Sequence, residues 1–194
     1  METAEIKNKF NERIYSDIVK KICFKFDEEK VHNFFVSFGK IIENRKMSRK
    51  IVEKLFNYQN PILEQELFGI NFRNPIGLSA GFDKNAELIP VMEDVGFGFC
   101  EVGSVTAKPC RGNSGKRLLR IPEKKSLWVN LGLNNNGANE ISSRLKKSKF
   151  NIPVGISIAK TNCKETTDTK IAIEDYVYSL EKFHKENIGD YFTI

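Results

Sequence analysis

Small and polar residues that could bind a ligand follow a short apolar segment at residues 74–85, NPIGLSAGFDKN. Ala80 and Gly81 would let a flat ligand approach the backbone closely. Lys84 could neutralise an anionic substrate or a reduced cofactor. A tight turn is an equally good interpretation, with Asp83 capping the next helix and Lys84 in solvent. The segment is therefore a candidate binding loop with a structural alternative.

Three later segments repeat this pattern of an apolar run that ends in polar residues. Their hydroxyls, amides and free backbone groups suit a carbonyl-rich ring, a carboxylate or a phosphate. Each segment alone is also compatible with ordinary turn or helix-cap chemistry. Four such places near the carboxyl ends of successive strands describe the mouth of an α/β barrel. The segments are EVGSVT (101–106), VNLGLNNNG (129–137) and GISIAKTN (155–162).

Apolar segments alternate with helical ones from residue 61 onward, which predicts parallel βαβ units. A small hairpin is expected at 64–72, and 103–125 is expected to be rich in loops. Main strands are predicted at 75–80, 98–102, 153–158 and 191–194, and helices at 86–95, 136–147 and 171–187. Four main strands are half of an eight-stranded barrel, which needs about 250 residues. The 194 residues are therefore expected to be the N-terminal portion of a (β/α)8 barrel, truncated after the fourth main strand at Ile194.

Residues 1–60 form a separate helical region with 13 basic and 9 acidic side chains, a net charge of +4. Apolar residues recur at helical spacing from Ile14 to Phe26. Asp27 can cap a second helix, and a third is expected over 48–56. This region is interpreted either as a helical subdomain packed on the body or as a surface that lies on a membrane. The predicted domains are thus 1–60 and 61–194.

Composition and charge exclude several classes of protein. A hydrophobic content of 40% and a charged content of 29% are those of a globular chain. The four cysteines form no C-x-x-C pair and the two histidines are far apart, which argues for reduced thiols and against a metal site. The net charge of +6 is not accompanied by any nucleic-acid-binding motif, which argues against a nucleic-acid-binding protein. Neither a secretory signal nor a membrane-spanning run is expected from the sequence.

Taken together, these motifs resemble class 2, quinone-dependent dihydroorotate dehydrogenase. The resemblance runs from about residue 15 to residue 194. It rests on NPIGLSAGFDKNAE, GFGFCEVGSVTAKPCRGN with RLLRIPE, LGLNNNG and VGISIAKTN, and on YSDIVKKICFKFDEEKVHNF in the helical region. It implies an FMN enzyme of pyrimidine biosynthesis that oxidises (S)-dihydroorotate to orotate and reduces a membrane quinone. The implied location is peripheral, in contact with lipid on the cytoplasmic side of a membrane.

The resemblance also implies roles for individual residues. Those that match flavin contacts are Ala80, Gly81, Lys84, Ser104 and Ser157. Those that match the substrate side are Lys84, Asn130, Gly132, Leu133 and Asn134. His32 and Arg120 match residues near a quinone tunnel, which is expected between the first two helices.

The chain departs from the family pattern at three points. Val129 stands where the family has an amide that contacts orotate, and Ser157 stands where it has an asparagine beside FMN. The family's catalytic serine follows the fourth strand and is expected just after Ile194, so no catalytic base is assigned among these 194 residues. The chain by itself is expected to be inactive and to hold FMN weakly. Two alternatives stay open: another FMN-barrel oxidoreductase with a different small substrate, and a non-catalytic membrane-binding module.

Overall fold

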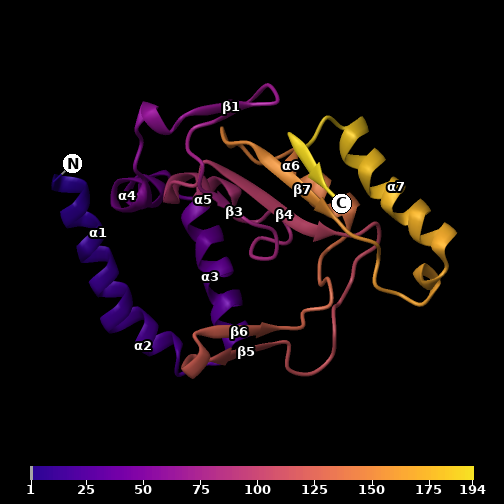
Figure 1. Cartoon of the computed structure of the whole chain (residues 1–194), viewed down its shortest axis with the longest axis horizontal. Coiled ribbons are helices and arrows are strands. Elements are labelled where there is room, and N and C mark those ends of the chain that lie inside the picture. The colour runs from indigo at the N-terminus through magenta and orange to yellow at the C-terminus, as the bar shows by residue number, and fades with distance from the viewer. Residues whose placement is uncertain (1) are drawn as a thin grey trace.

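The computed structural model describes residues 2–194 and has a four-stranded parallel sheet at its centre (Figure 1). The sheet order β3-β4-β7-β8 follows the order of the strands along the chain. The strands are β3 (Gly77–Leu78), β4 (Phe99–Val105), β7 (Val154–Ile158) and β8 (Tyr191–Thr193). The connecting helices are α5 (Ile89–Val95), α6 (Ala138–Leu145) and α7 (Thr169–Lys185). This alternation confirms the predicted parallel βαβ units.

The hydrophobic core lies between one face of the sheet and these three helices. Val102 of β4 and Ile156 of β7 are fully buried, as are Ile141 of α6 and Phe183 of α7. Burial of such side chains stabilises the fold by about 1.5–3 kcal/mol each.

The opposite face of the sheet carries glycines beside aromatic rings. Gly77 pairs with Phe99, and Gly155 pairs with Tyr191. A Cβ atom on Gly155 would lie 2.2 Å from the Tyr191 ring, so this position has room for no side chain. Ser157 and Thr193 follow on the same face, toward the carboxyl ends of the strands. The residues that could bind a ligand therefore gather at that edge.

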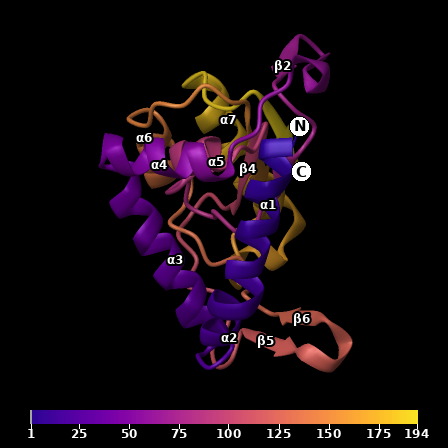
Figure 2. The ribbon, with the colours of Figure 1, turned by 90° about the vertical axis from the view of Figure 1, so that its left-hand side faces the viewer.

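The N-terminal helices form a V that opens away from a corner near Phe24–Asp27 (Figure 2). They are α1 (Glu2–Ile14), a π-helical turn (Tyr15–Val19), α2 (Lys20–Cys23), α3 (Glu28–Glu43) and α4 (Lys46–Phe56). The Asp27 carboxylate accepts hydrogen bonds from the backbone N–H groups of Glu29 and Lys30, which confirms the predicted cap. Among residues 2–194, no helix combines the length and apolar character that a bilayer crossing requires.

The helical region depends on the body for its packing. Gly39 is the one buried residue among residues 5–60, and a Cβ there would meet Leu88 at 2.5 Å. Arg49 of α4 binds both carboxylate oxygens of Asp94 on α5, at 2.6 and 2.9 Å. At the far end, Lys7 and Asn11 of α1 donate to backbone carbonyls at and just after the end of α4.

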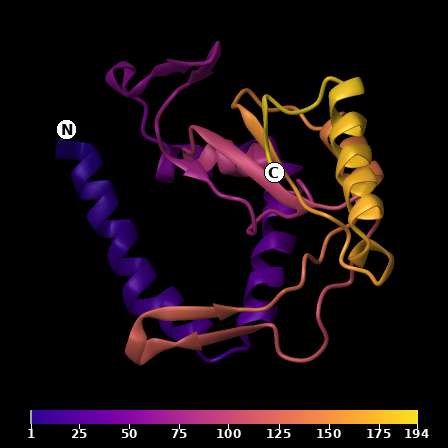
Figure 3. The ribbon, with the colours of Figure 1, turned by 45° about the vertical axis from the view of Figure 1, so that its right-hand side comes forward.

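Two antiparallel hairpins complete the fold. β1 (Gln65–Leu67) pairs with β2 (Ile70–Phe72), as predicted. β5 (Leu118–Ile121) pairs with β6 (Ser126–Val129), and this hairpin lies beside the corner between α2 and α3 (Figure 3). Short 3-10 turns occupy Pro61–Leu63, Pro122–Lys124 and Glu165–Thr167.

Some boundaries differ from the prediction. The first main strand was predicted over 75–80 but spans two residues, and the second extends to Val105 rather than 102. The helix predicted from residue 86 begins at Ile89, because Ala86 has a φ of 54° that no α-helix accepts. Pro90 then suits the first turn of α5, where no backbone N–H is required.

The fourth main strand also differs from the prediction at its end. It was predicted over 191–194, but β8 ends at Thr193 and Ile194 lies outside it. The pairing with β7 runs as far as Ser157 and Thr193. Ile194 is 80% exposed at the carboxyl edge of the sheet.

Candidate functional site

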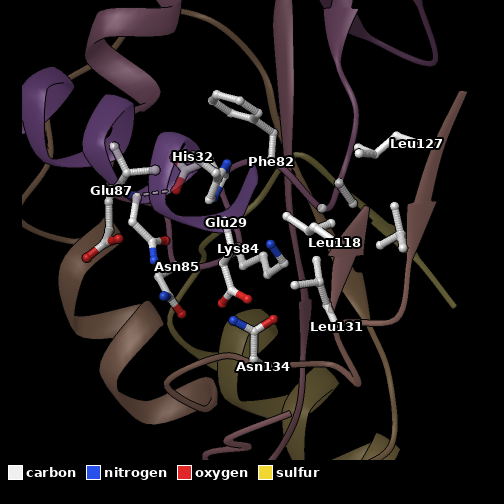
Figure 4. Close-up of a pocket in the computed structure, with 16 residues that line it drawn as sticks. Glu29, His32, Phe82, Lys84, Asn85, Glu87, Leu118, Leu127, Leu131 and Asn134 are labelled. Carbon is white, nitrogen blue, oxygen red and sulfur yellow. Dashed lines mark hydrogen bonds between the residues drawn. The ribbon is translucent and has the colours of Figure 1, made fainter. Parts of the chain in front are cut away.

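A cavity of about 410 Å³ lies between α3, the loop after β3 and the β5–β6 hairpin (Figure 4). Ala80, Gly81 and Lys84 line it from the loop, and Glu29 and His32 line it from α3. Its remaining walls include Phe82, Asn85, Glu87, Leu118, Leu127, Val129, Leu131 and Asn134. The structure thus brings together residues from four separate segments of the sequence.

The loop at residues 80–88 is fixed by a buried aspartate. The Asp83 carboxylate accepts hydrogen bonds from the backbone N–H groups of Glu87, at 2.7 Å, and Leu88, at 2.8 Å. Burial raises the pKa of Asp83, although these two hydrogen bonds act in the opposite direction. With Asp83 held in this way, the next residue, Lys84, lies half-buried in the cavity wall.

Lys84 lies in a cavity that contains both positive and negative neighbours. Burial lowers its pKa, Glu29 raises it, Arg117 lowers it and Asp83 raises it, each neighbour acting through its charge. Lys84 lines the cavity, so an anionic ligand that enters it would lie beside this side chain.

His32 lies on α3 across the cavity from the loop. Its imidazole ring packs edge-on against Phe82, with ring centroids 5.1 Å apart. Burial lowers its pKa, and the charge of Lys84 lowers it further. The neutral imidazole is therefore the dominant form at neutral pH, with one nitrogen able to donate and the other able to accept.

Asn134 provides a buried hydrogen-bond acceptor and Gly81 provides open space, which together suit a ligand with polar edges. The Asn134 side-chain oxygen is buried and has no hydrogen-bond partner within the described part of the protein. Such an orphaned acceptor costs stability unless a partner satisfies it. A Cβ atom on Gly81 would meet no atom within 4 Å. Both residues line the cavity, so a flat molecule with N–H groups fits this end of it.

The β5–β6 hairpin supplies an apolar wall. Leu118 pairs with Val129 across the two strands, and Leu127 follows on the same face. Leu131 continues this wall beyond β6. The cavity is thus apolar on the hairpin side and polar on the side of α3 and the loop.

A pair of serines extends the polar side along the sheet. Ser104 of β4 and Ser157 of β7 share a hydrogen bond of 3.1 Å between their hydroxyl groups. The backbone N–H of Gly81 donates to the carbonyl of Gly103 at 2.9 Å, which joins this pair to the cavity loop. A Cβ on Gly103 would lie 2.5 Å from the Ser157 carbonyl oxygen, so glycine permits this close approach.

Six of the predicted site residues lie outside the cavity lining: the two serines just described and four others. Asn130 accepts hydrogen bonds from Asn113 at both its backbone and its side-chain oxygen. The carbonyl of Gly132 accepts one from Asn162, and the carbonyl of Leu133 accepts one from Asn135. Arg120 donates to the carbonyl of Phe26 and lies over the Phe24 ring. Their proposed ligand roles stay predictions.

The resemblance predicts the catalytic base just after the carboxyl end of β8. The Thr193 hydroxyl donates to the Glu101 carboxylate at 3.1 Å, and Ile194 follows as an exposed residue. A serine just after Ile194 would lie outside residues 2–194, which the structure describes. The assignment of the base to that position therefore stays a prediction.

A second, apolar cavity of about 590 Å³ lies between α3, α4 and α5. Phe35, Phe38, Ile51 and Met92 line it, and Phe82 lines both cavities. The resemblance implies a quinone tunnel between the first two helices, whereas this hollow is bounded by α3, α4 and α5. No group of three potential ligands for a metal ion occurs among residues 2–194.

Several residues that line the cavity were not marked by the sequence as candidate ligand contacts. Glu29 matched the first turn of a helix, and its contact with Arg117 spans 88 residues. Phe82 and the leucines of the hairpin had the character of ordinary core residues. The hairpin register alone could have placed Leu118, Leu127 and Val129 on one face.

These features define a class: an α/β protein whose candidate ligand site lies at the carboxyl ends of parallel strands. A family model described as dihydroorotate dehydrogenase matches residues 62–194. The chain is 39% identical over 168 residues to the dihydroorotate dehydrogenase (quinone) of Christiangramia forsetii, and 41% identical over 143 residues to that of Gloeobacter violaceus. The chain belongs to the dihydroorotate dehydrogenase family, which confirms the resemblance found in its motifs.

Solved structures show the same fold. The DHODH of Eimeria tenella in complex with ferulenol is 26% identical, with a TM-score of 0.60 over 76% of this chain and 42% of that chain. The ligand-free form is 27% identical, with a TM-score of 0.59. The matches with the two bacterial relatives cover 87% and 74% of this chain but 48% and 39% of the relatives. The chain thus spans at most about half the length of these curated relatives.

Proposed function

We propose that the protein oxidises (S)-dihydroorotate to orotate in pyrimidine biosynthesis, with FMN in the cavity beside Lys84. One observation carries this proposal. Lys84, His32 and the orphaned oxygen of Asn134 line a single cavity at the carboxyl ends of the parallel strands, next to small residues. A cation, a neutral imidazole and a buried acceptor suit an anionic, heterocyclic substrate.

The residues present fit FMN. Ala80 and Gly81 would allow the flavin ring to approach the backbone, and the hydroxyls of Ser104 and Ser157 would bond its polar edge. Lys84 would hold the negative charge of the substrate and of the reduced cofactor. When bound, FMN supplies hydride acceptance and the stepwise release of electrons. The proton acceptor for this reaction is not assigned to any of the 194 residues.

The four parallel strands are proposed to be the first four of a (β/α)8 barrel. Residues 61–194 would be its first half, and the second half would follow Ile194. Their order in the sheet equals their order in the chain, as a barrel requires. Polar residues gather at the carboxyl ends of the strands, where barrel enzymes have their active sites.

Residues 1–60 are proposed to bind a membrane peripherally, on its cytoplasmic side, and to admit a quinone. Many of their apolar side chains are exposed, and the apolar cavity between α3 and α5 meets the polar one at Phe82. His32 lines the polar cavity and Arg120 lies over Phe24 at the corner before α3, so both are proposed to flank the quinone route. The net charge of +4 suits anionic lipid.

Reduction of a soluble quinone that depends on dihydroorotate, measured with the complete gene product, tests the proposal. We expect bound flavin, visible as yellow absorbance, and turnover with dihydroorotate. Lys84→Ala should lower kcat/KM by about 100-fold or more, because it removes a charge-assisted contact. Lys30→Ala, on an exposed side chain of α3 that does not line the cavity, should change kcat/KM little. A colourless wild-type protein would instead support the non-catalytic membrane-binding module.

Val129 favours a second candidate, an FMN oxidoreductase with a different small substrate. Its side chain lines the cavity beside Leu118 and Leu131, so this wall offers no amide to a pyrimidine. Bound flavin without dihydroorotate turnover, together with turnover of a less polar cyclic acid, would support this candidate. Restored dihydroorotate turnover in Val129→Asn would identify this residue as the cause.

A further inference from the structure

An ion pair at the rim of the cavity connects the helical region to the loop before β5. The Arg117 guanidinium donates to both carboxylate oxygens of Glu29, one of them through Nε at 3.1 Å. A third nitrogen donates to the carbonyl of Arg111 at 2.9 Å. Both side chains are largely buried, with 19% of Arg117 and 24% of Glu29 exposed. This geometry fixes the direction of both side chains.

The other charged groups near Lys84 are held by their own partners. Asp83 binds backbone N–H groups of its own loop, and Glu87 binds Lys40 at 2.5 Å. His32 faces Lys84 from α3 as a largely neutral ring. Glu29 and Arg117 are two of the three charged residues that shift the pKa of Lys84, and they bind each other.

We propose that Glu29 and Arg117 are a positioning pair: Glu29 holds the guanidinium against α3, so that an anionic ligand in the cavity meets Lys84 rather than Arg117. This inference rests on the proposed function, in which Lys84 is the cation that binds flavin and substrate. Arg117 keeps its charge at all relevant pH values, so without Glu29 it would compete for the same anion.

The neighbouring carboxylate provides a matched control. Glu28 lies one residue earlier on α3 and also binds the β5 region, through the backbone N–H of Arg120 and the ammonium of Lys116. It does not line the cavity. A general loosening of the contact between α3 and β5 would therefore result from changing either glutamate, whereas an effect on Lys84 should result from changing Glu29 alone.

The test measures the acetylation rate of Lys84 across a pH series in the flavin-free complete gene product, by peptide mass spectrometry, with Lys30 as the internal reference. Glu29→Gln should speed the acetylation about three- to tenfold at a fixed pH, because the neutral amine gains population. Arg117→Gln should slow it, because Glu29 is then free to pair with Lys84. Glu29→Gln/Arg117→Gln should return the rate close to that of the wild type, and Glu28→Gln should leave it unchanged.

The opposite signs separate a charge effect from misfolding, since unfolding would expose Lys84 and speed acetylation in every variant. Three outcomes would each overturn the proposal: equal acetylation rates in all variants, equal effects of Glu29→Gln and Glu28→Gln, or faster acetylation in Arg117→Gln. Flavin content and turnover of the wild type are measured separately. A wild type that lacks flavin would count against the proposed function alone, and the charge coupling would still be read from the acetylation rates.

Discussion

At the residue scale, Asp83 holds a turn and the adjacent Lys84 lines the cavity. Asp83 fixes the loop through two backbone hydrogen bonds, as a turn residue would. That restraint places Lys84 in the cavity wall instead of in solvent. In the sequence, the turn and the ligand contact were alternatives. The structure has the turn with Lys84 in the cavity wall, and the ligand contact stays a proposal.

Gly155→Ala should destabilise the protein by about 2–3 kcal/mol, because the added methyl group would lie 2.2 Å from the Tyr191 ring. Urea unfolding measures this loss. Gly115→Ala is the control: its φ is 79° and no atom lies within 4 Å of the added methyl group, so backbone strain of about 1 kcal/mol is the expected cost. Equal losses in the two variants would show that β8 can shift to admit the methyl group.

At the element scale, the helices are held to each other by a few well-defined polar contacts. Arg49 joins α4 to α5 through Asp94 and the carbonyl of Pro90. Glu186 joins α6 to the end of α7 through the Ser142 hydroxyl and the ammonium of Lys146. Such contacts fix the angle between elements that apolar packing alone would leave variable.

Arg49→Met should lower the free energy of unfolding by about 1–3 kcal/mol, because it leaves the largely buried Asp94 carboxylate without its partner. The change is measured by urea denaturation. Lys50→Met, at an adjacent exposed position of the same helix, should change stability by less than about 0.5 kcal/mol. Similar values for both variants would contradict a specific role for the Arg49 contact.

Glu186 should make stability depend on acid pH. The Ser142 hydroxyl, Lys182 and Lys146 hold the pKa of its carboxyl at about 2, below the usual value of 4.5. A lowered folded-state pKa contributes stability above the unfolded-state pKa, and this contribution is lost as the pH falls from about 5 to about 2. Glu186→Gln should therefore be less stable than the wild type at neutral pH, and urea unfolding across a pH series should show the two converging in acid. Glu181→Gln, at a side chain that is 54% exposed, is the control and should change stability at neutral pH by less than about 0.5 kcal/mol.

At the scale of the whole molecule, the helical region and the sheet differ in what they expose. The sheet and its helices enclose a core, whereas α1 and the helical turns after it expose an apolar row at four-residue intervals. That row is Ile6, Phe10, Ile14, Ile18 and Ile22. Exposed apolar rows beside basic residues are typical of surfaces that lie in a membrane interface.

Phe10→Ser/Ile18→Ser should reduce binding to vesicles with about one-third anionic lipid by about tenfold or more, since two apolar anchors are lost. Co-sedimentation with the vesicles measures the bound fraction. Ile62→Ser is the control, because Ile62 is 84% exposed but lies outside the helical region. Unchanged binding of the double variant would show that these helices do not contact the lipid. Binding that is insensitive to salt would exclude the lysines from this role.

Much of the fold was predictable because it depends on local patterns. The alternation of apolar and helical segments predicted the parallel sheet, Asp27 predicted the start of α3, and the motif order predicted the family. Strand lengths were less predictable, since β3 pairs over two residues only and β8 stops before Ile194. Among the predicted site residues, Gly81 and Lys84, which follow the first main strand, line the cavity.

The sequence by itself determined the family, the order of the elements and the small residues of the loop after β3, because these depend on neighbouring residues and their spacing. The tertiary structure alone decided that Val129, not Asn130, lines the cavity, because alternate residues of an extended segment point to opposite faces. It also decided the pairing of Glu29 with Arg117 across 88 residues. No local pattern encodes such a contact, since it depends on how α3 and the β5–β6 hairpin pack together.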